Sequence, residues 1–206
     1  MIGHGLHSLV GALCVVASLR ALDLIGVEMT ATSAKDIYNL LEYHPSLEEL
    51  DLSQSGITDD MVISWESALM VNENLKILTL RGNGLTGLGV QHLSLVLLEN
   101  THLKDLDLSY NECDDTGAQS LGIALQVNTV LCRLDLSSNE QISFNGWAQF
   151  VAEAENNRSL RSLSVDFNPS ITEQISQSMQ QWMARNQPQQ WVRPQIASHL
   201  KSSFLI

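Results

Sequence analysis

Aspartates occupy the same place in a tetrapeptide, Leu-Asp-Leu-Ser, that occurs three times along the chain. They are Asp51, Asp107 and Asp135. Two carboxylates held close together can serve as general acid and general base, provided that burial raises the pKa of one of them. On an open surface the same carboxylates instead form an acidic stripe that can bind a basic protein surface. The chemistry therefore depends on the elements that position the tetrapeptides.

Other residue types that commonly perform chemistry are scattered along the chain. The six histidines show neither an HExxH pattern nor a cysteine at metal-ligand spacing. Paired aspartates at 59–60 and 114–115 each fall in the first turn of an expected helix, where carboxylates interact favourably with the helix dipole. No nucleotide-binding P-loop is present. The sequence therefore predicts no catalytic residue, no metal site and no cofactor.

The pattern LxxLxL recurs along the chain and positions the aspartates. Its starts are 28 residues apart four times, and the sixth copy follows the fifth by 29 residues. Such alternation predicts short strands whose leucines point inward and whose intervening side chains line one shared face. We expect these strands near residues 19–24, 47–52, 75–80, 103–108, 131–136 and 160–165.

Residues suited to a turn and then to a helix start follow each strand. Four of the six repeats have an asparagine at the ninth position, whose amide can satisfy backbone groups where the chain leaves the strand: Asn83, Asn111, Asn139 and Asn168. One residue per repeat has a side-chain oxygen able to cap the free amides of a first helical turn: Thr30, Thr58, Thr86, Asp114, Ser143 and Thr172.

Apolar residues at helical spacing follow each cap and predict an outer, convex layer of helices. Examples are Val90, Leu93, Leu97 and Leu98 in one repeat and Ala118, Leu121, Ile123, Ala124 and Leu125 in the next. Another column stands three residues before the strands, at His44, Asn72, Asn100, Asn128 and Asn157. We expect these residues to take up the left-handed conformation that often ends a helix.

Residues 100–139, NTHLKDLDLSYNECDDTGAQSLGIALQVNTVLCRLDLSSN, resemble the leucine-rich repeats of ribonuclease inhibitor, the NOD-like receptors, the Ran GTPase-activating protein and tropomodulin. The resemblance extends over roughly residues 1–186. It implies an α/β fold: a right-handed leucine-rich-repeat solenoid, or horseshoe, of about six 28-residue repeats, with a parallel concave sheet and convex helices. Such solenoids are typically scaffolds for protein interaction, although the repeat itself names no partner.

The register of the expected strands places Asp107 beside Asp135 on the concave face, at the rung spacing of about 4.8 Å. Carboxylates so close together need either compensation or a basic ligand. Compensation could come from the second residues of the strands, a largely basic column: Arg20, Glu48, Lys76, Lys104, Cys132 and Arg161. A solvated, self-compensated face and an acidic partner-binding stripe therefore both remain open.

Tyr110 and Phe167 are the candidate exposed aromatic anchors of this face. An open surface gives its carboxylates little desolvation, so we expect binding rather than catalysis. The candidate partner-binding residues are Glu49, Asp51, Arg81, Asp105, Asp107, Tyr110, Asp135 and Phe167.

Composition restricts the partners. Hydrophobic residues make up 44% and charged residues 17% of the 206, as in globular rather than membrane proteins. The net charge of -12 repels nucleic-acid phosphates and anionic lipid surfaces, so we expect neither as a partner. The odd set of cysteines, Cys14, Cys113 and Cys132, predicts a reducing, cytoplasmic location rather than secretion or delivery into another cell.

The two ends of the sequence depart from the repeat. Residues 1–9 align with residues 85–93, so the first helix has no cap before it, and the repeat stops near Pro188. We expect a leucine-rich-repeat domain at residues 1–187 and a cap or tail at residues 188–206. The uncapped first helix is compatible with two alternatives: the chain is the carboxy-terminal part of a longer repeat array, or this helix packs against a partner or a second copy. The apolar tail could likewise cap the last repeat or contact a partner.

Three functions are compatible with these features. The leading hypothesis is a non-catalytic scaffold or subunit that presents the concave face to a protein partner; the acidic residues of that face would suit a partner with a basic surface. The alternatives are a regulatory activator of a small GTPase, as in the Ran activator that the repeats resemble, with Arg81 as its functional residue, and a structural subunit of a large assembly.

Overall fold

The computed structural model describes residue 13 and residues 16–186, in which strands and helices alternate. The elements are β1 (Ala21–Asp23), α2 (Ala31–Tyr43), β2 (Glu49–Asp51), α3 (Asp59–Val71), β3 (Ile77–Thr79), α4 (Gly87–Glu99), β4 (Asp105–Asp107), α5 (Asp115–Val127), β5 (Arg133–Asp135), α6 (Phe144–Ala154), β6 (Ser162–Ser164) and α7 (Glu173–Asn186). The expectations for the first helix and for the tail at 188–206 concern residues outside this part of the chain.

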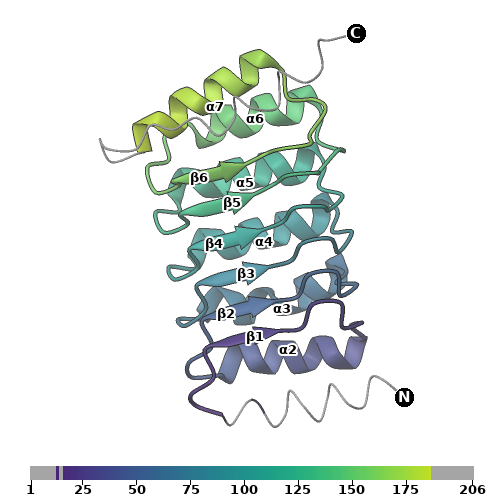
Figure 1. Ribbon diagram of the computed structural model, residues 1–206. Helices are drawn as coiled ribbons and strands as arrows, with labels where there is room; N and C mark the ends of the chain where they lie inside the picture. The colour runs from purple at the N-terminus through teal and green to yellow at the C-terminus, as the bar shows by residue number, and fades with distance from the viewer. Residues whose placement is uncertain (1–12, 14–15, 187–206) are drawn as a thin grey trace.

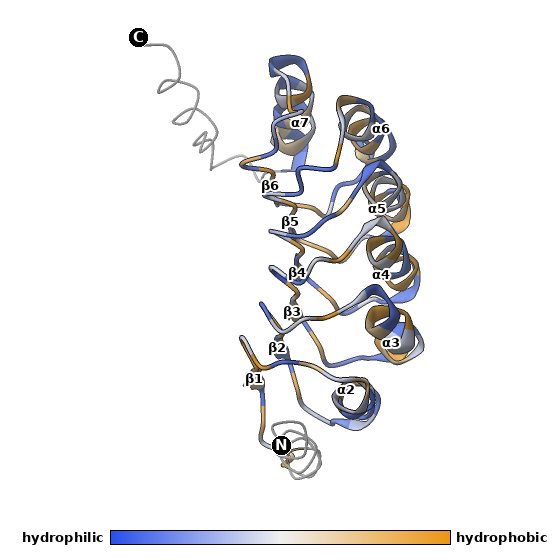
Figure 2. Ribbon diagram, turned by 90° about the vertical axis from the view of Figure 1, so that its right-hand side faces the viewer, coloured by the Kyte–Doolittle hydropathy of each residue, from blue (hydrophilic) through white to orange (hydrophobic). Residues whose placement is uncertain are grey.

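All the strands belong to one sheet, in the order β1-β2-β3-β4-β5-β6, and each pairs in parallel with the next. Figure 1 shows the rungs stacked along the molecule, and Figure 2, turned by 90°, shows the helices gathered on one side of the sheet. The predicted fold class is therefore confirmed: the chain is a leucine-rich-repeat solenoid.

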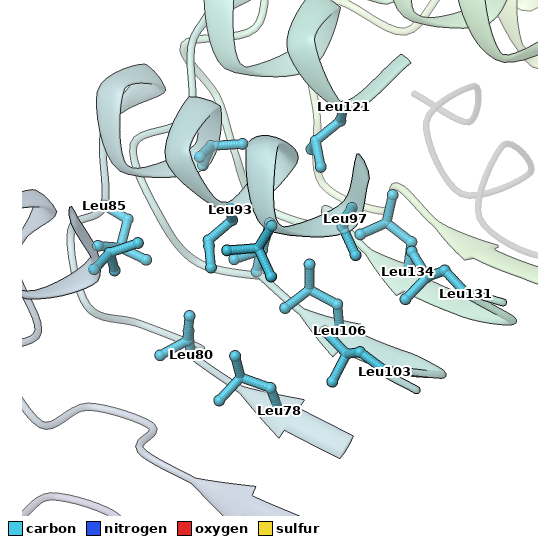
Figure 3. Packing of buried hydrophobic residues seen from close by; sticks show 14 of the residues in the cluster. Leu78, Leu80, Leu85, Leu93, Leu97, Leu103, Leu106, Leu121, Leu131 and Leu134 are labelled. Atoms are coloured by element: carbon cyan, nitrogen blue, oxygen red, sulfur yellow. The ribbon is translucent and has the colours of Figure 1, made fainter. Parts of the chain in front are cut away.

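The core lies between the sheet and the helices and runs through the whole stack. Leu78, Leu106 and Leu134 occupy equivalent positions on successive strands and are each at most 1% exposed. Figure 3 shows these strand leucines directed toward helix residues such as Leu93 and Leu121. Burying one such side chain contributes about 1.5–3 kcal/mol to folding, so the repeated leucines supply the main driving force.

The asparagines that follow the strands form a ladder, as the sequence predicts. The amide nitrogen of Asn111 donates to the carbonyl oxygens of Leu80 and Leu108, both at 3.0 Å. Its side-chain oxygen accepts from the backbone amides of Asn83 and Leu85, both at 3.0 Å. One side chain thus satisfies backbone groups of two successive repeats.

A second ladder joins the ends of the helices, and here the expected left-handed conformation is wrong. Asn72 and Asn128, for example, have extended backbone, with φ −69° and ψ 122° and 124°. The side chains provide the hydrogen bonds instead, because the Asn100 amide nitrogen donates 2.7 Å to the Leu69 carbonyl while its oxygen accepts from the amide of Leu103 at 2.8 Å. Asparagine suits this position because its side-chain amide both donates and accepts hydrogen bonds, not because its backbone tolerates a left-handed conformation.

Packing of successive helices explains a second difference from expectation. Leu98 and Ile123 belong to the apolar helical pattern of the sequence, but they are 40% and 44% exposed. Small residues take the positions between helices: a Cβ added at Gly122 would lie 3.0 Å from the carbonyl oxygen of Phe150 in α6. Close approach of the helices therefore leaves these larger side chains on the convex surface.

A candidate protein-binding face

The exposed face of the sheet brings the acidic candidates together in two groups. Asp107 pairs in register with Asp135, and Asp105 with Arg133. Glu49 and Asp51 lie on β2, beside Ala21 and Asp23 of β1. The intervening strand presents Ile77 and Thr79, so an uncharged rung separates the two acidic groups.

Each aspartate of the Leu-Asp-Leu-Ser tetrapeptide also has a structural role that the sequence analysis missed. Asp107 accepts a hydrogen bond through Oδ1 from the backbone amide two residues later, at 2.8 Å, and Asp135 does the same at 2.8 Å. Oδ1 of Asp51 accepts from both the amide and the hydroxyl of Ser53, at 2.9 and 2.6 Å. These contacts shape the turn at which the chain leaves the strand. The repeated Leu-Asp-Leu-Ser tetrapeptide could have indicated this role, because aspartate commonly accepts from the amide two residues later in a turn.

The expected charge compensation is only partly present. Glu48 is paired with Arg20 at 3.1 Å and with Lys76, all within the column of second strand residues. Asp105 is paired with Arg133 at 2.6 Å, a partner outside that column. Across the described residues, no ion pair reaches Asp107 or Asp135. The basic column therefore neutralises its own glutamate rather than the aspartates beside it.

Arg81 and Tyr110 form one unit on adjacent repeats. The Arg81 guanidinium lies 3.9 Å from the centre of the Tyr110 ring, and its Nη1 donates to the Ser109 hydroxyl at 3.0 Å. Stacking of this kind holds an arginine in one orientation. Tyr110 nevertheless stays 48% exposed. Arg81 is thus a supporting residue of an aromatic surface rather than a freely extended cation.

Tyr110 and Phe167 stand at a position of the repeat where the backbone is left-handed. Their φ angles are 56° and 60°, in the left-handed region, which the equivalent residues of the other repeats also adopt: Gly26, Gln54, Gly82 and Ser138. A non-glycine residue there costs of order 1–2 kcal/mol. Phe167 is 67% exposed. Two bulky aromatic side chains are therefore held outward at places where the backbone favours glycine.

The carboxylates of this face lie on an open surface rather than in an enclosed pocket. Asp107 and Asp135 are both partly exposed, and little desolvation is available to raise the pKa of a carboxyl group in such a setting. Among the described residues, no group of three or more histidine, cysteine or acidic side chains is arranged to hold a metal ion. None of the described helices is long and apolar enough to cross a membrane.

Comparison with known proteins identifies leucine-rich repeats in the chain. The family model described as "Leucine Rich repeat" matches residues 43–60, 71–94 and 99–122. A comparison with curated protein sequences finds no match.

Solved structures share the fold at low sequence identity. "Leiomodin-1 Actin-Binding Site 2 (ABS2)" is 17% identical with a TM-score of 0.69, over 77% of this chain and 90% of that one. A tropomodulin C-terminal domain of Caenorhabditis elegans is 15% identical with a TM-score of 0.52, over 88% and 92%. The yeast complex of Rad7 and Elc1 has a chain 16% identical with a TM-score of 0.51, over 72% of this chain and 37% of that one. These likenesses establish the fold.

Proposed function

We propose that the chain is a non-catalytic protein-interaction subunit, built from repeats of the ribonuclease-inhibitor subtype, that binds a partner with a basic surface on its concave face. The 28-residue spacing of the strands and the alternation of strand and helix support the subtype. Proteins with this fold usually bind other proteins, because a row of strands gives a broad, continuous surface.

Uncompensated acidic charge on the concave face carries the proposal. Asp107 and Asp135 are register neighbours, and each accepts through Oδ1 only, which leaves Oδ2 directed at no described cation. Two adjacent carboxylates without a counter-ion repel one another. A partner's lysine or arginine placed between them would relieve that repulsion and gain charge-assisted hydrogen bonds.

Exposed aromatic side chains beside the acidic residues would supply the apolar part of the contact. Tyr110 comes three residues after Asp107, the end of β4, and Phe167 three residues after Ser164, the end of β6. Both side chains are exposed. Aromatic residues are the commonest energetic centres of protein interfaces. We assign Glu49, Asp51 and Asp105 to the rim of the same interface, since they lie on the same sheet face.

Activation of a GTPase is less well supported. An activator that works by inserting an arginine needs that side chain free to enter another protein's active site, whereas Arg81 is stacked on Tyr110 and bonded to Ser109. A structural subunit that uses the ends of the solenoid would depend on residues 1–12 and 187–206, which the structure does not describe. The free thiols of Cys113 and Cys132 support an intracellular, reducing location. The division into a repeat domain at 1–187 and a cap or tail at 188–206 also remains part of the proposal.

Replacing Asp107 and Asp135 together by asparagine tests the function. The Asn oxygen can still accept from the amides of Ser109 and Ser137, so the turns are preserved while the charge is removed. We expect a partner captured by the wild-type chain to bind the double variant at least about tenfold more weakly, since charge-assisted bonds are each worth about 1.5–3 kcal/mol. Asp60→Asn, on the exposed start of α3, is the matched control.

Actin is the first defined protein to include in this test, because the leiomodin-1 domain that shares the fold is described as an actin-binding site. Binding of purified actin monomer to the wild-type chain and to both variants can be measured by calorimetry, beside capture from source lysate. Unchanged capture of every specific partner by the double variant, folded by circular dichroism, would refute the concave-face proposal.

A further inference from the structure

A polar hollow lies on the edge where the strands begin, away from the aromatic residues of the concave face. Its volume is about 320 Å³, and Thr129, Cys132, Arg158, Ser159 and Arg161 line it. These residues belong to the loop that leads from α5 into β5 and to the next loop, from α6 into β6. In Figure 1 these loops lead into the strands labelled β5 and β6, in the upper part of the stack.

The charge of this hollow is opposite to that of the whole chain. Residues 128–132 and 157–161 include two arginines and no carboxylate, although acidic residues outnumber basic ones by 23 to 11 in the chain. Two of the five lining side chains are thus cationic, and two others bear hydroxyl groups. The nearest carboxylate along the chain, Glu155, contributes its backbone carbonyl to Arg158.

Arg158 is held in position by the backbone. Its Nη1 donates to the carbonyl oxygens of Glu155 and Asn157, at 3.0 and 2.9 Å. A guanidinium has five N–H donors, so these two contacts, both from Nη1, fix the group and leave donors on its other nitrogens. Ser159 is fixed in a similar way, because its hydroxyl lies 3.2 Å from the Asn128 carbonyl and 3.0 Å from the Asn157 amide nitrogen.

We propose that this hollow binds a phosphate group. A planar carboxylate is satisfied by a single arginine fork, whereas donors from two arginines on one loop and a hydroxyl on the neighbouring loop surround a tetrahedral oxyanion. The two arginines neutralise the charge of the phosphate, and the Thr129 hydroxyl donates to it from the neighbouring loop. This site is independent of the proposed function, since it uses other residues, on another edge, and takes a ligand of opposite charge.

Titration of the isotope-labelled full chain with inorganic phosphate, at constant ionic strength set with chloride, tests the site. We expect saturable shifts of the amide resonances of Thr129, Cys132 and Ser159. Arg158→Gln and Arg161→Gln should each weaken phosphate binding about tenfold or more, because each removes charged hydrogen bonds to the anion. Lys76→Gln, a cation on the same edge that pairs with Glu48, should leave binding unchanged.

Two further variants separate loss of the ligand contact from loss of the fold. Thr129→Val preserves shape and removes one donor, so it should weaken binding severalfold. Arg161→Lys keeps the charge without the fork and should give an intermediate affinity. Shifts that stay linear, shifts that chloride alone reproduces, or binding that the arginine variants retain would overturn the site.

Two further ligands, titrated in the same way, would show which kind of molecule carries the phosphate group. Free phosphoserine that binds as well as inorganic phosphate would assign the site to small phosphate compounds. A phosphoserine peptide that binds about tenfold more tightly than phosphoserine would assign it to a phosphorylated protein segment. Either result supports the phosphate site, and both should be lost in Arg158→Gln.

Discussion

At the scale of single residues, several side chains serve the fold and the surface together. Asp107 shapes the turn after β4 through one carboxylate oxygen and presents the other on the concave face. A preference for aspartate at this place in the repeat is therefore explained by local structure alone. Local structure does not explain why the second oxygen has no counter-ion among the described residues, and the proposed binding role of Asp107 would account for it.

The two described cysteines should differ strongly in reactivity. Burial, reinforced by the charges of Asp114 and Asp115, raises the pKa of the Cys113 thiol, whereas Cys132 is only partly buried. The thiolate is the reactive form, so Cys113 should resist alkylation at neutral pH while Cys132 is labelled. Mass spectrometry after maleimide treatment of a Cys14→Ser variant would count the modified thiols.

Unfolding in urea before the treatment is the control, because Cys113 should then react like Cys132. Equal labelling of both cysteines in the folded chain would contradict the described burial of Cys113.

Glu48 should make stability depend on pH in the acidic range. The hydrogen bond from Lys76, followed by the charges of Lys76 and Arg20, lowers the pKa of its carboxyl group against an opposing effect of desolvation. A carboxyl whose pKa is lower in the folded state stabilises the fold above its unfolded pKa of about 4.3, and this contribution is lost as the pH falls through the folded value. Glu48→Gln should therefore be less stable at pH 7, with the difference vanishing in strong acid.

Urea denaturation of both chains across this pH range measures the effect. The difference at neutral pH should also shrink with added salt, because the pairs are exposed. Glu140→Gln, a surface change outside any ion pair shown by the described residues, is the control. A difference between wild type and Glu48→Gln that persists undiminished below the unfolded pKa would exclude the ion pairs as its cause.

At the scale of elements, the strands and caps could be predicted because each depends on a few neighbouring residues. Ser143 caps α6, with its hydroxyl accepting from the amides of Asn145 and Gly146. The helix ends were mispredicted because their asparagines act across repeats: the Asn128 side chain reaches the Leu97 carbonyl, 31 positions away. Contacts of that kind depend on how repeats stack, which local propensity does not encode.

Glycines on the helices set how closely the repeats approach. A Cβ at Gly122 would lie 2.9 Å from Cβ of Glu153 and 3.0 Å from the Phe150 carbonyl oxygen in α6. Alanine gains about 1 kcal/mol of helix propensity over glycine, but overpacking costs typically 1–3 kcal/mol. Two of the atoms nearest to the added Cβ are backbone atoms of Phe150, which cannot move aside easily. We therefore expect the cost of overpacking to exceed the gain in helix propensity, so that Gly122→Ala destabilises the fold by about 1–2 kcal/mol.

Chemical denaturation would measure this change, with Ile123→Ala as the neighbouring control. Ile123 is 44% exposed, and its truncation should alter stability by less than about 0.5 kcal/mol. A stabilised Gly122→Ala variant would show that α6 can shift away at no cost.

At the scale of the whole molecule, each repeat contacts only its neighbours, so stability is a sum of repeat and interface contributions. The residues that share the exposed face of the sheet could be predicted because register follows directly from the spacing. The charge balance of this face could not be predicted, since Arg133 pairs with Asp105 on the neighbouring strand while Lys76 pairs with Glu48. The proposed phosphate site could not be predicted either, because it depends on two loops that the repeat pattern does not distinguish from those of the other repeats.

The asparagine ladder should couple neighbouring repeats, and Asn111 lies at its centre. Its removal leaves the backbone amides of Asn83 and Leu85 without their side-chain acceptor, while the carbonyl oxygens of Leu80 and Leu108 keep the donors of Asn83 and Asn139. Each buried group left unsatisfied costs about 1–3 kcal/mol, with part recovered by water. We therefore expect Asn111→Ala to destabilise the fold by about 2–4 kcal/mol, as measured by denaturation.

Hydrogen exchange would show where that loss is felt. In a solenoid coupled only between neighbours, amides of Asn83 and Leu85 should lose protection first, while that of Leu136, bonded to Ser164, should be affected least. Asn145→Ala, at an exposed position of α6, should change neither region. Equal loss of protection from β1 to β6 in Asn111→Ala would mean that the repeats unfold as one unit, so that the ladder acts globally rather than between adjacent rungs.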